Sequence, residues 1–194
     1  MRIIGGKARG LRLTGPGKIK IRPTSDMVRE ALFNMIDVDG SSFLDLFAGT
    51  GAAGCEAISR GASHVTFVEN HKPSVSLIRK NVDKVLHALE SEPVVKVIKI
   101  DAVKFLERNL KIPERQYEYL FCDPPYDWEE NLPKLLDRVA ACTEKNALAP
   151  GGTLILETSS SLKTELPFKY EKRKKYGDTA LLFYTFSALA RNGM

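Results

Sequence analysis

The chain has 194 residues, of which 43% are hydrophobic, so it is large enough for one domain with a buried core and too apolar to be disordered. The net charge is +5, the N-terminus lacks the apolar stretch of a signal peptide, and no apolar run approaches the roughly 20 residues that span a bilayer. The three cysteines, Cys55, Cys122 and Cys142, are an odd number without metal-ligand spacing, which favours buried free thiols in a reducing compartment. We therefore expect a cytoplasmic protein with no bound metal and no membrane association.

Basic residues are concentrated at the N-terminus. Residues 1–29 contain eight Lys and Arg residues against the single acid Asp26, a net charge of +7, which leaves −2 for the other 165 residues. Apolar residues nearly alternate along this stretch, and Gly5-Gly6 and Gly15-Pro16-Gly17 supply turns, a pattern typical of short β-ribbons. We expect residues 1–22 to form a basic β-ribbon extension that binds phosphates, followed by one domain over residues 23–194. A solvated basic tail is the alternative.

A helix is predicted directly after this extension. Thr24 or Ser25 can serve as its N-cap, and apolar residues recur at helical spacing from Val28 to Ile36. Arg29 lies one turn from Asp26 on this helix, so the two side chains can pair with each other, or Arg29 can contact phosphate.

From residue 42 onward, strand and helix patterns alternate. Strands are expected at residues 42–46, 65–68, 94–100, 119–122 and 152–156, and helices at residues 52–60, 73–85, 102–110 and 129–142. Two last strands, residues 170–176 and 179–186, have no helix between them and predict an antiparallel edge hairpin. Repeated βαβ units build a parallel sheet with helices on both faces. The sequence therefore predicts an α/β fold with a mostly parallel, seven-stranded sheet.

A glycine-rich stretch, residues 47–51, follows the first parallel strand and is called the glycine turn below. Gly49 and Gly51 permit positive φ and a close approach of backbone to ligand, and Gly54 permits close packing of helix on strand. The N-terminus of the following helix offers N–H groups and a partial positive charge. This pattern is typical of a nucleotide site, and a plain strand-to-helix turn is the alternative.

Acidic residues stand at or just after the ends of three successive predicted strands: Asp45, Glu69 and Asp101. The carboxyl ends of parallel strands form the edge at which open α/β folds bind ligands. Glu69 suits a ribose diol and Asp101 an adenine amine, although either acid could instead cap a helix. Asp45 would repel a pyrophosphate and attract a cation. It therefore favours S-adenosylmethionine, which carries an ammonium and a sulfonium, over a dinucleotide.

The tetrapeptide Asp123-Pro124-Pro125-Tyr126 directly follows a buried strand pattern that ends at Cys122. The Asp123 carboxylate and the Pro124 carbonyl can accept the two N–H bonds of an amine on a flat ring. The prolines fix φ, which aims these acceptors, and Tyr126 can stack on the ring. The alternative is an ordinary turn that closes a strand.

Together these motifs resemble a known family. Residues 2–10, 22–34 and 43–51, with the acids and the tetrapeptide, look closely like the RsmD family. Members are bacterial class I S-adenosylmethionine-dependent methyltransferases that act on N2 of a guanine in 16S rRNA. The resemblance covers nearly the whole chain and departs at Met27, where a basic residue is usual.

The resemblance implies a Rossmann-like fold, S-adenosylmethionine as cofactor, and 16S rRNA of the 30S subunit as partner, with guanine 966 as the target and no DNA partner. It implies a cofactor-binding set of Asp45, Phe47, Ala48, Gly49, Thr50, Gly51, Glu69, Asn70, Asp101 and Ala102. The target guanine would be held by the catalytic set Asp123, Pro124, Pro125 and Tyr126. The expected RNA contacts are Arg2, Lys7, Arg9, Arg12, Arg22 and Arg29. Nothing in the sequence indicates more than a monomer.

Other functions share part of this pattern. A DNA adenine-N6 or cytosine-N4 methyltransferase would use the same tetrapeptide but usually needs an added target-recognition domain, for which the chain has no room. A protein glutamine methyltransferase typically has Asn where Asp123 stands. A non-catalytic rRNA-binding module would not need an intact glycine turn. If the basic extension is a separate RNA-binding element, deleting residues 1–20 should spare cofactor binding and abolish RNA methylation.

Overall fold

The computed structural model describes residues 1–17, 24–89, 92–111, 116–144 and 148–186, and the chain divides into two compact units. The first unit is Met1–Asp101 and the second is Ala102–Met194. None of the helices within these described residues is long and apolar enough to cross a bilayer. The boundary between the units directly follows the third strand.

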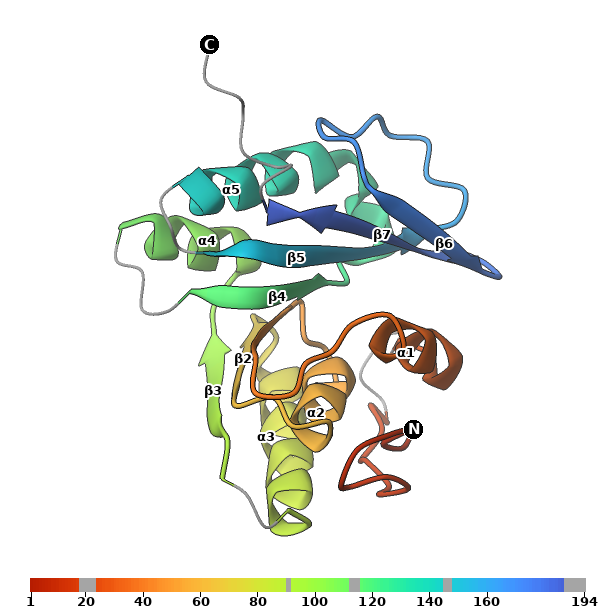
Figure 1. Cartoon of the computed structure of the whole chain (residues 1–194), viewed down its shortest axis with the longest axis vertical. Coiled ribbons are helices and arrows are strands. Elements are labelled where there is room, and N and C mark those ends of the chain that lie inside the picture. The colour runs from red at the N-terminus through yellow and green to blue at the C-terminus, as the bar shows by residue number, and fades with distance from the viewer. Residues whose placement is uncertain (18–23, 90–91, 112–115, 145–147, 187–194) are drawn as a thin grey trace. The chain divides into compact units, whose positions relative to one another are not determined.

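The first unit contains three parallel strands and three helices (Figure 1). The strands are β1 (Ser42–Leu46), β2 (His64–Glu69) and β3 (Val94–Lys99), in the order β3-β2-β1, with Leu46 opposite Val68 and Glu69 opposite Lys99. The helices are α1 (Asp26–Phe33), α2 (Ala52–Ser59) and α3 (Lys72–His87). Their positions confirm the predicted alternation, with no end shifted by more than three residues.

Helix α2 lies at the centre of this unit. All its residues are buried, and it contacts β1, β2 and α3. A Cβ atom on Gly54 would overlap the ring of Phe67, so only glycine allows this close packing of helix on strand. The structure thus confirms the predicted role of Gly54.

Helix α1 begins at the predicted cap. The Ser25 hydroxyl accepts a 3.2 Å hydrogen bond from the N–H of Val28, which satisfies one of the free donors of the first turn. Val28, Leu32 and Phe33 are buried, and Phe33 stacks on Phe43 of β1 with ring centroids 5.8 Å apart. The helix ends at Phe33, three residues before the end of the apolar pattern.

The N-terminal segment, residues 1–17, differs from the expected β-ribbons. Its only regular pairing among the described residues is one antiparallel bridge between Arg2 and Arg12, next to a 2.9 Å hydrogen bond from the Ile3 N–H to the Leu11 carbonyl. The reason is that backbone groups of this segment pair with α2. The N–H groups of Lys7 and Ala8, for example, donate to the carbonyl and the hydroxyl of Ser59, over 2.8 and 2.9 Å. The predicted extension also included residues 18–22, which lie outside the described residues.

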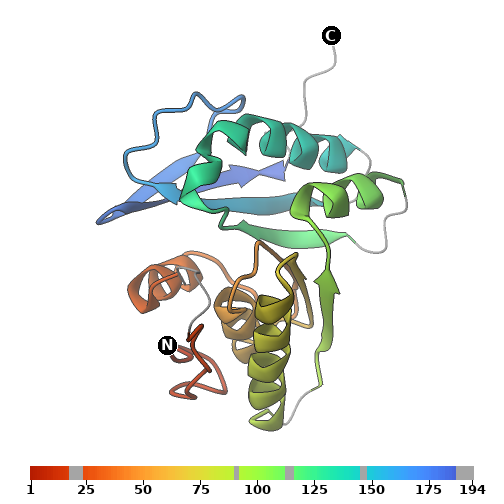
Figure 2. The same cartoon turned by 180° about the vertical axis from the view of Figure 1, so that it is seen from behind.

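The second unit contains the other four strands, in the order β4-β5-β7-β6 (Figure 2). They are β4 (Tyr117–Cys122), β5 (Leu148–Ser159), β6 (Lys172–Tyr176) and β7 (Thr179–Thr185). Strands β4 and β5 are parallel, while β7 runs antiparallel to both β5 and β6. This arrangement confirms the predicted edge hairpin and the mostly parallel, seven-stranded α/β fold class.

Helices α4 (Ala102–Lys111) and α5 (Leu132–Glu144) lie side by side in the second unit (Figures 1 and 2). The chain reaches α5 through a 3-10 helix, η1 (Tyr126–Asn131), so α5 begins three residues later than predicted. Pro133 is compatible with this start because proline is tolerated in the first helical turn.

All three cysteines are buried free thiols, as predicted. Burial raises the pKa of the Cys142 thiol to about 12, so this thiol is neutral at physiological pH.

Candidate active site

The glycine turn joins β1 to α2 through backbone conformations that few residues adopt. Gly49 and Gly51 have φ values of 54° and 75°, which confirms the predicted positive φ at both. Phe47 has a φ of 61°, a left-handed conformation that the sequence did not reveal. The Ala48 N–H donates to the Val68 carbonyl over 3.0 Å, which anchors the turn to the end of β2.

Asp45 lies at the end of β1 beneath this turn. Its side chain is 1% exposed, and its Oδ2 accepts a 3.0 Å hydrogen bond from the N–H of Gly54 in the first turn of α2. A carboxylate at a helix N-terminus is stabilised by the helix dipole. Asp45 therefore places a buried carboxyl group next to the first turn of α2, where the glycine turn ends.

Glu69 reaches the glycine turn from the end of β2. Its Oε2 accepts from the N–H of Gly49 over 2.9 Å, and its Oε1 accepts from the N–H of His71 over 2.8 Å. A carboxylate has about four acceptor sites, so two remain for ligand hydroxyls. The structure thus brings together Glu69 and Gly49, twenty residues apart in sequence. Asn70, the next residue, is exposed.

The other members of the predicted cofactor set are placed as follows. Asp101 is half-buried just after β3, at the same carboxyl edge of the first unit's strands as Asp45 and Glu69. Thr50 is 3% exposed, and its hydroxyl donates to the sulfur of Met1 over 3.4 Å. Ala102 begins α4 in the second unit and is buried.

The tetrapeptide directly follows β4 in the second unit. Asp123 is half-buried, Pro124 is buried, and Pro125 caps η1 with φ −53° and ψ 145°. The Pro125 carbonyl accepts a 2.9 Å hydrogen bond from the Trp128 N–H, which closes the first turn of η1. This is compatible with the preceding carbonyl, that of Pro124, serving as the predicted amine acceptor. Tyr126 begins η1, and its side chain lies outside what the structure describes.

A small pocket adjoins the tetrapeptide within the second unit, between η1, α5 and the end of β5. Its lining is made up of Pro124, Pro125, Glu129, Leu132, Thr158 and Ser159. The sequence did not point to Glu129, whose Oε1 accepts from the N–H groups of Lys163 and Thr164 over 2.8 and 3.2 Å. The Lys163 N–H, followed by that of Thr164, holds the pKa of the Glu129 carboxyl below its usual value. Glu129 therefore fixes the chain after β5 beside the prolines.

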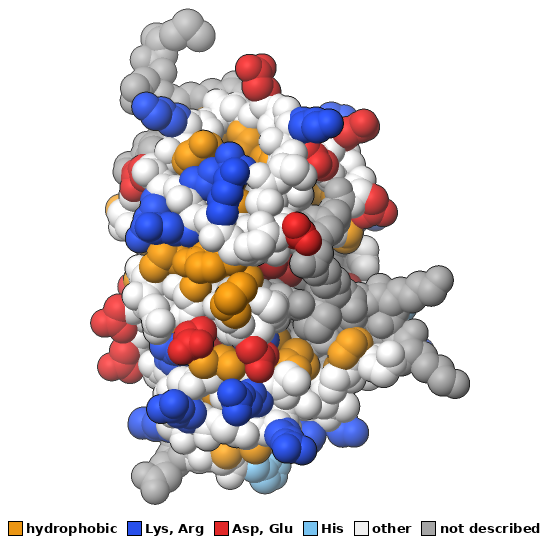
Figure 3. Space-filling view, turned by 90° about the vertical axis from the view of Figure 1, so that its right-hand side faces the viewer, with side chains coloured by type: hydrophobic (Ala, Val, Ile, Leu, Met, Phe, Trp, Pro, Cys, Tyr) orange, Lys and Arg blue, Asp and Glu red, His pale blue; other side chains and the backbone are white. Residues whose placement is uncertain are grey.

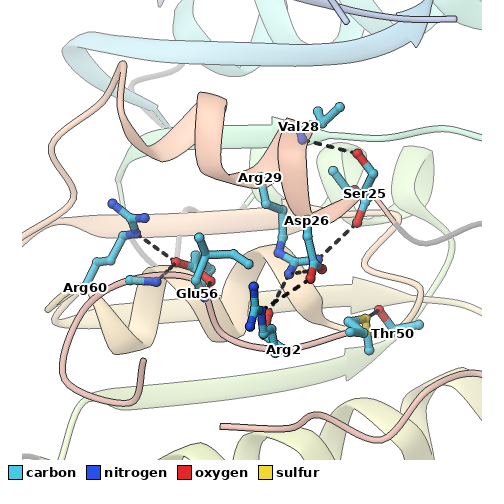
Figure 4. A network of polar contacts seen from close by, with 12 residues as sticks. Arg2, Ser25, Asp26, Val28, Arg29, Thr50, Glu56 and Arg60 are labelled. Carbon is cyan, nitrogen blue, oxygen red and sulfur yellow. Dashed lines mark hydrogen bonds and ion pairs between the residues drawn. The ribbon is translucent and has the colours of Figure 1, made fainter. Parts of the chain in front are cut away.

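Arg29 is not an RNA contact, which corrects one prediction from the sequence. Its side chain is fully buried and donates to the carbonyls of Thr24 and Arg2, over 3.0 and 2.7 Å, and to Oδ1 of Asp26 over 2.9 Å (Figure 4). The alternative that paired Arg29 with Asp26 is confirmed. Arg29 fastens α1 to the N-terminal segment.

The other basic candidates in the described part of the segment remain accessible. Arg2, Lys7, Arg9 and Arg12 are all exposed, although Arg2 also lies 3.9 Å from Asp26. Figure 3 shows one face of the molecule, with several Lys and Arg side chains over its lower part and acidic side chains above them. Arg22, the remaining candidate, lies outside the described residues.

Two buried polar residues that the sequence did not single out hold the N-terminal segment. Glu56 of α2 is fully buried and accepts from the N–H groups of Ile4 and Gly5 over 2.8 and 2.7 Å, and it pairs with Arg60 at 2.9 Å (Figure 4). Asn81 of α3 is also fully buried and bonds to Thr14. The sequence could have pointed to Glu56 and Asn81, because each places a charged or amide side chain within an otherwise apolar helical pattern.

The fold, the glycine turn with its acids, and the tetrapeptide after β4 define a class I methyltransferase. The family model described as "Conserved hypothetical protein 95" matches residues 1–185, and the chain belongs to this family, the RsmD family of methyltransferases.

Individual relatives match over most of their length. YlbH of Bacillus subtilis is 34% identical over 191 residues, which are 95% of this chain and 98% of YlbH. The ribosomal RNA small subunit methyltransferase D of Haemophilus influenzae is 35% identical over 162 residues, 81% of this chain and 78% of that protein. A solved structure, a hypothetical protein of Thermus thermophilus, is 30% identical with a TM-score of 0.77, covering 94% of this chain and 98% of that one.

Proposed function

We propose that this protein is a bacterial cytoplasmic rRNA methyltransferase that transfers a methyl group from S-adenosylmethionine to the exocyclic N2 of a guanine in 16S rRNA, guanine 966. The observation that carries the proposal is the tetrapeptide directly after β4, beside a pocket, in a chain of the RsmD family. The name of the Haemophilus influenzae relative supports small-subunit rRNA as the substrate.

The residues of the first unit fit S-adenosylmethionine. The buried Asp45 carboxylate suits the positive charges of this cofactor and would disfavour a pyrophosphate. Glu69 retains acceptor capacity for two ribose hydroxyls, and Asp101 would accept from the adenine amine. The bound cofactor would supply an electrophilic methyl group. The positive φ at Gly49 and Gly51 lets the backbone of the glycine turn approach the cofactor closely.

The tetrapeptide would hold and activate the guanine amine. Its lone pair is delocalised into the ring, so the amine is a poor nucleophile. Hydrogen bonds from both N–H groups to the Asp123 carboxylate and the Pro124 carbonyl would return electron density to nitrogen and aim it. The guanine must be swung out of its stack to reach these acceptors, and Tyr126 would then stack on it.

No strongly basic group is required for the proton. Once nitrogen carries the methyl group and a positive charge, it is strongly acidic, so Asp123 or water can take the proton. Positioning and electrostatic stabilisation would supply most of the rate enhancement. This chemistry requires that the nitrogen held by Asp123 lie in line with the methyl group that the bound cofactor donates.

The exposed cations of the N-terminal segment would bind rRNA phosphates. Arg2, Lys7, Arg9 and Arg12 belong to the part of the chain in which positive charge is concentrated. The protein would act as a monomer on 16S rRNA or on the 30S subunit.

A transfer assay with labelled S-adenosylmethionine tests this proposal. The protein is incubated with naked 16S rRNA, assembled 30S subunits or duplex DNA. We expect label in 16S rRNA, either free or in the subunit, and none in DNA. Label in DNA alone would identify an adenine-N6 or cytosine-N4 methyltransferase, and no label in any substrate would leave a non-catalytic rRNA-binding module.

A further inference from the structure

Asn81 joins two parts of the first unit that have different proposed tasks. Its side chain is fully buried on α3. Its Oδ1 accepts from the Thr14 N–H over 2.7 Å, and its Nδ2 donates to the Thr14 carbonyl over 3.1 Å and to the Thr50 carbonyl over 3.0 Å. Thr14 belongs to the N-terminal segment, and Thr50 belongs to the glycine turn.

These bonds use both donors of the Asn81 amide. One points to the N-terminal segment and the other to the glycine turn, so neither neighbour can move far without leaving a buried donor unpaired. An unsatisfied buried polar group costs about 1–3 kcal/mol. The amide therefore favours one position of Thr14 together with one position of Thr50.

A second contact joins the same two parts. The Thr50 hydroxyl donates to the sulfur of Met1 over 3.4 Å, so the glycine turn also contacts the first residue of the segment directly (Figure 4). In addition to Asn81, the half-buried Lys84 of α3 donates to the Thr14 hydroxyl over 2.9 Å. Lys84 thus holds Thr14 but is not hydrogen-bonded to Thr50 in the described contacts, which makes it a matched control.

We propose that Asn81 is a positioning residue that couples cofactor binding at the glycine turn to RNA binding by the N-terminal segment. This inference rests on the proposed function. A cofactor that fixes the glycine turn also fixes Thr14 through Asn81, and RNA that fixes the segment also fixes Thr50. Because coupling between two binding sites is reciprocal, each ligand then tightens the other by the same factor.

The test uses Asn81→Asp, which keeps the shape and the acceptor of the side chain but removes both donors, and Lys84→Met as the control. The Kd of S-adenosylhomocysteine is measured by equilibrium dialysis for the whole protein, with and without whichever of 16S rRNA or 30S subunits the wild type methylates. We expect RNA to lower the Kd about fivefold or more in the wild type and in Lys84→Met. In Asn81→Asp, we expect the Kd for S-adenosylhomocysteine to be about tenfold higher than in the wild type, and RNA to leave it unchanged.

Thermal melting establishes that the variants fold, and a second measurement covers the case in which Asn81→Asp does not. In the wild type, amide hydrogen exchange at Thr14 should slow when S-adenosylhomocysteine binds. An unchanged Thr14 exchange rate, or a folded Asn81→Asp variant with wild-type affinity and wild-type coupling, would overturn the inference. A wild type that binds S-adenosylhomocysteine without coupling refutes only this inference, whereas a wild type that does not bind it refutes the proposed function as well.

Discussion

The backbone N–H of Gly5 donates a 2.7 Å hydrogen bond to Oε1 of Glu56, a fully buried carboxylate. This bond fastens the basic N-terminal segment to α2, the helix that begins at the glycine turn. The segment is therefore part of the first unit's packing, and Ile3 and Leu13 within it are buried. A side chain at Gly5 would collide with the Arg60 guanidinium, which also pairs with Glu56.

Substitution of Glu56 tests this anchor. In Glu56→Ala, two backbone N–H groups and Arg60 lose their acceptor, so we expect a loss of about 3–5 kcal/mol in the free energy of unfolding. Glu107→Ala is the control because Glu107 forms an ion pair with Arg138 at 3.3 Å on the surface. Its effect should stay within about 0.5 kcal/mol. Urea unfolding measures the free energy of unfolding of both variants. Equal losses would show that Glu56 does not anchor the N-terminal segment.

The same contacts change the expectation for a truncated chain. Deleting residues 1–20 would remove the partners that Glu56, Ser59 and Asn81 have in the N-terminal segment, and would uncover apolar surface. The deletion should therefore destabilise the first unit and weaken cofactor binding, instead of sparing it as a separate extension would.

The close packing at Gly54 leads to a further prediction. A Cβ atom there would overlap the Phe67 ring, so Gly54→Ala should cost about 1–3 kcal/mol of stability and shift the glycine turn. Gly15→Ala is the matched control, since a Cβ atom at Gly15 meets no atom within 4 Å. Thermal melting with and without S-adenosylhomocysteine measures both effects. Equal melting temperatures for the two variants would contradict the packing described for α2.

The contacts of Glu129 predict that the stability of the fold depends on pH. Its pKa is lowered in the folded state, chiefly by the Lys163 N–H, so the charged carboxylate stabilises the fold above its unfolded pKa. This contribution is lost as pH falls through the lower, folded pKa. Wild type should therefore be more stable than Glu129→Gln at neutral pH, and the difference should shrink in acid. Urea unfolding at several pH values measures how the stability difference between wild type and Glu129→Gln changes. Glu130→Gln, at an exposed residue, is the control. A difference that grows in acid would exclude this role.

The basic residues predict a salt dependence of RNA binding. Replacing Arg9 and Arg12 by Gln would remove two of the proposed phosphate contacts, so the slope of log Kd against log salt should fall by about 1.5. Arg79 and Lys80, exposed on α3, are replaced together as the control of equal charge. The same reduction of slope in both double variants would show that net charge, and not the N-terminal segment, determines RNA binding.

The sequence predicted the fold well because the elements of this chain carry local signals. β1 matches residue for residue, and the Ser25 cap, Gly54 and the edge hairpin are all where composition and spacing placed them. Among the described residues the predicted β-ribbons are reduced to one bridge, because alternation of apolar residues does not reveal what the backbone pairs with. In this segment Ile4 and Gly5 pair with a carboxylate about fifty residues away.

The site was predicted less completely for a related reason. Asp45, Glu69 and the glycines stand next to strand ends, so topology brings them together. Arg29, Asn81 and Glu129 act through tertiary contacts. A guanidinium on a predicted helix looks like a phosphate contact until burial and its bonds to Thr24 and Asp26 are known.

The most direct measurement of the central claim is nucleoside analysis by mass spectrometry of 16S rRNA after incubation with S-adenosylmethionine and either wild type or Asp123→Ala. We predict N2-methylguanosine with the wild type and a rate reduced about 100- to 1,000-fold or more in the variant, because an amine-orienting acceptor is lost. The Kd of the variant for S-adenosylhomocysteine should stay within about twofold, since the cofactor set lies elsewhere in the sequence. Near-normal turnover by Asp123→Ala, or methylation at another base atom, would contradict the account.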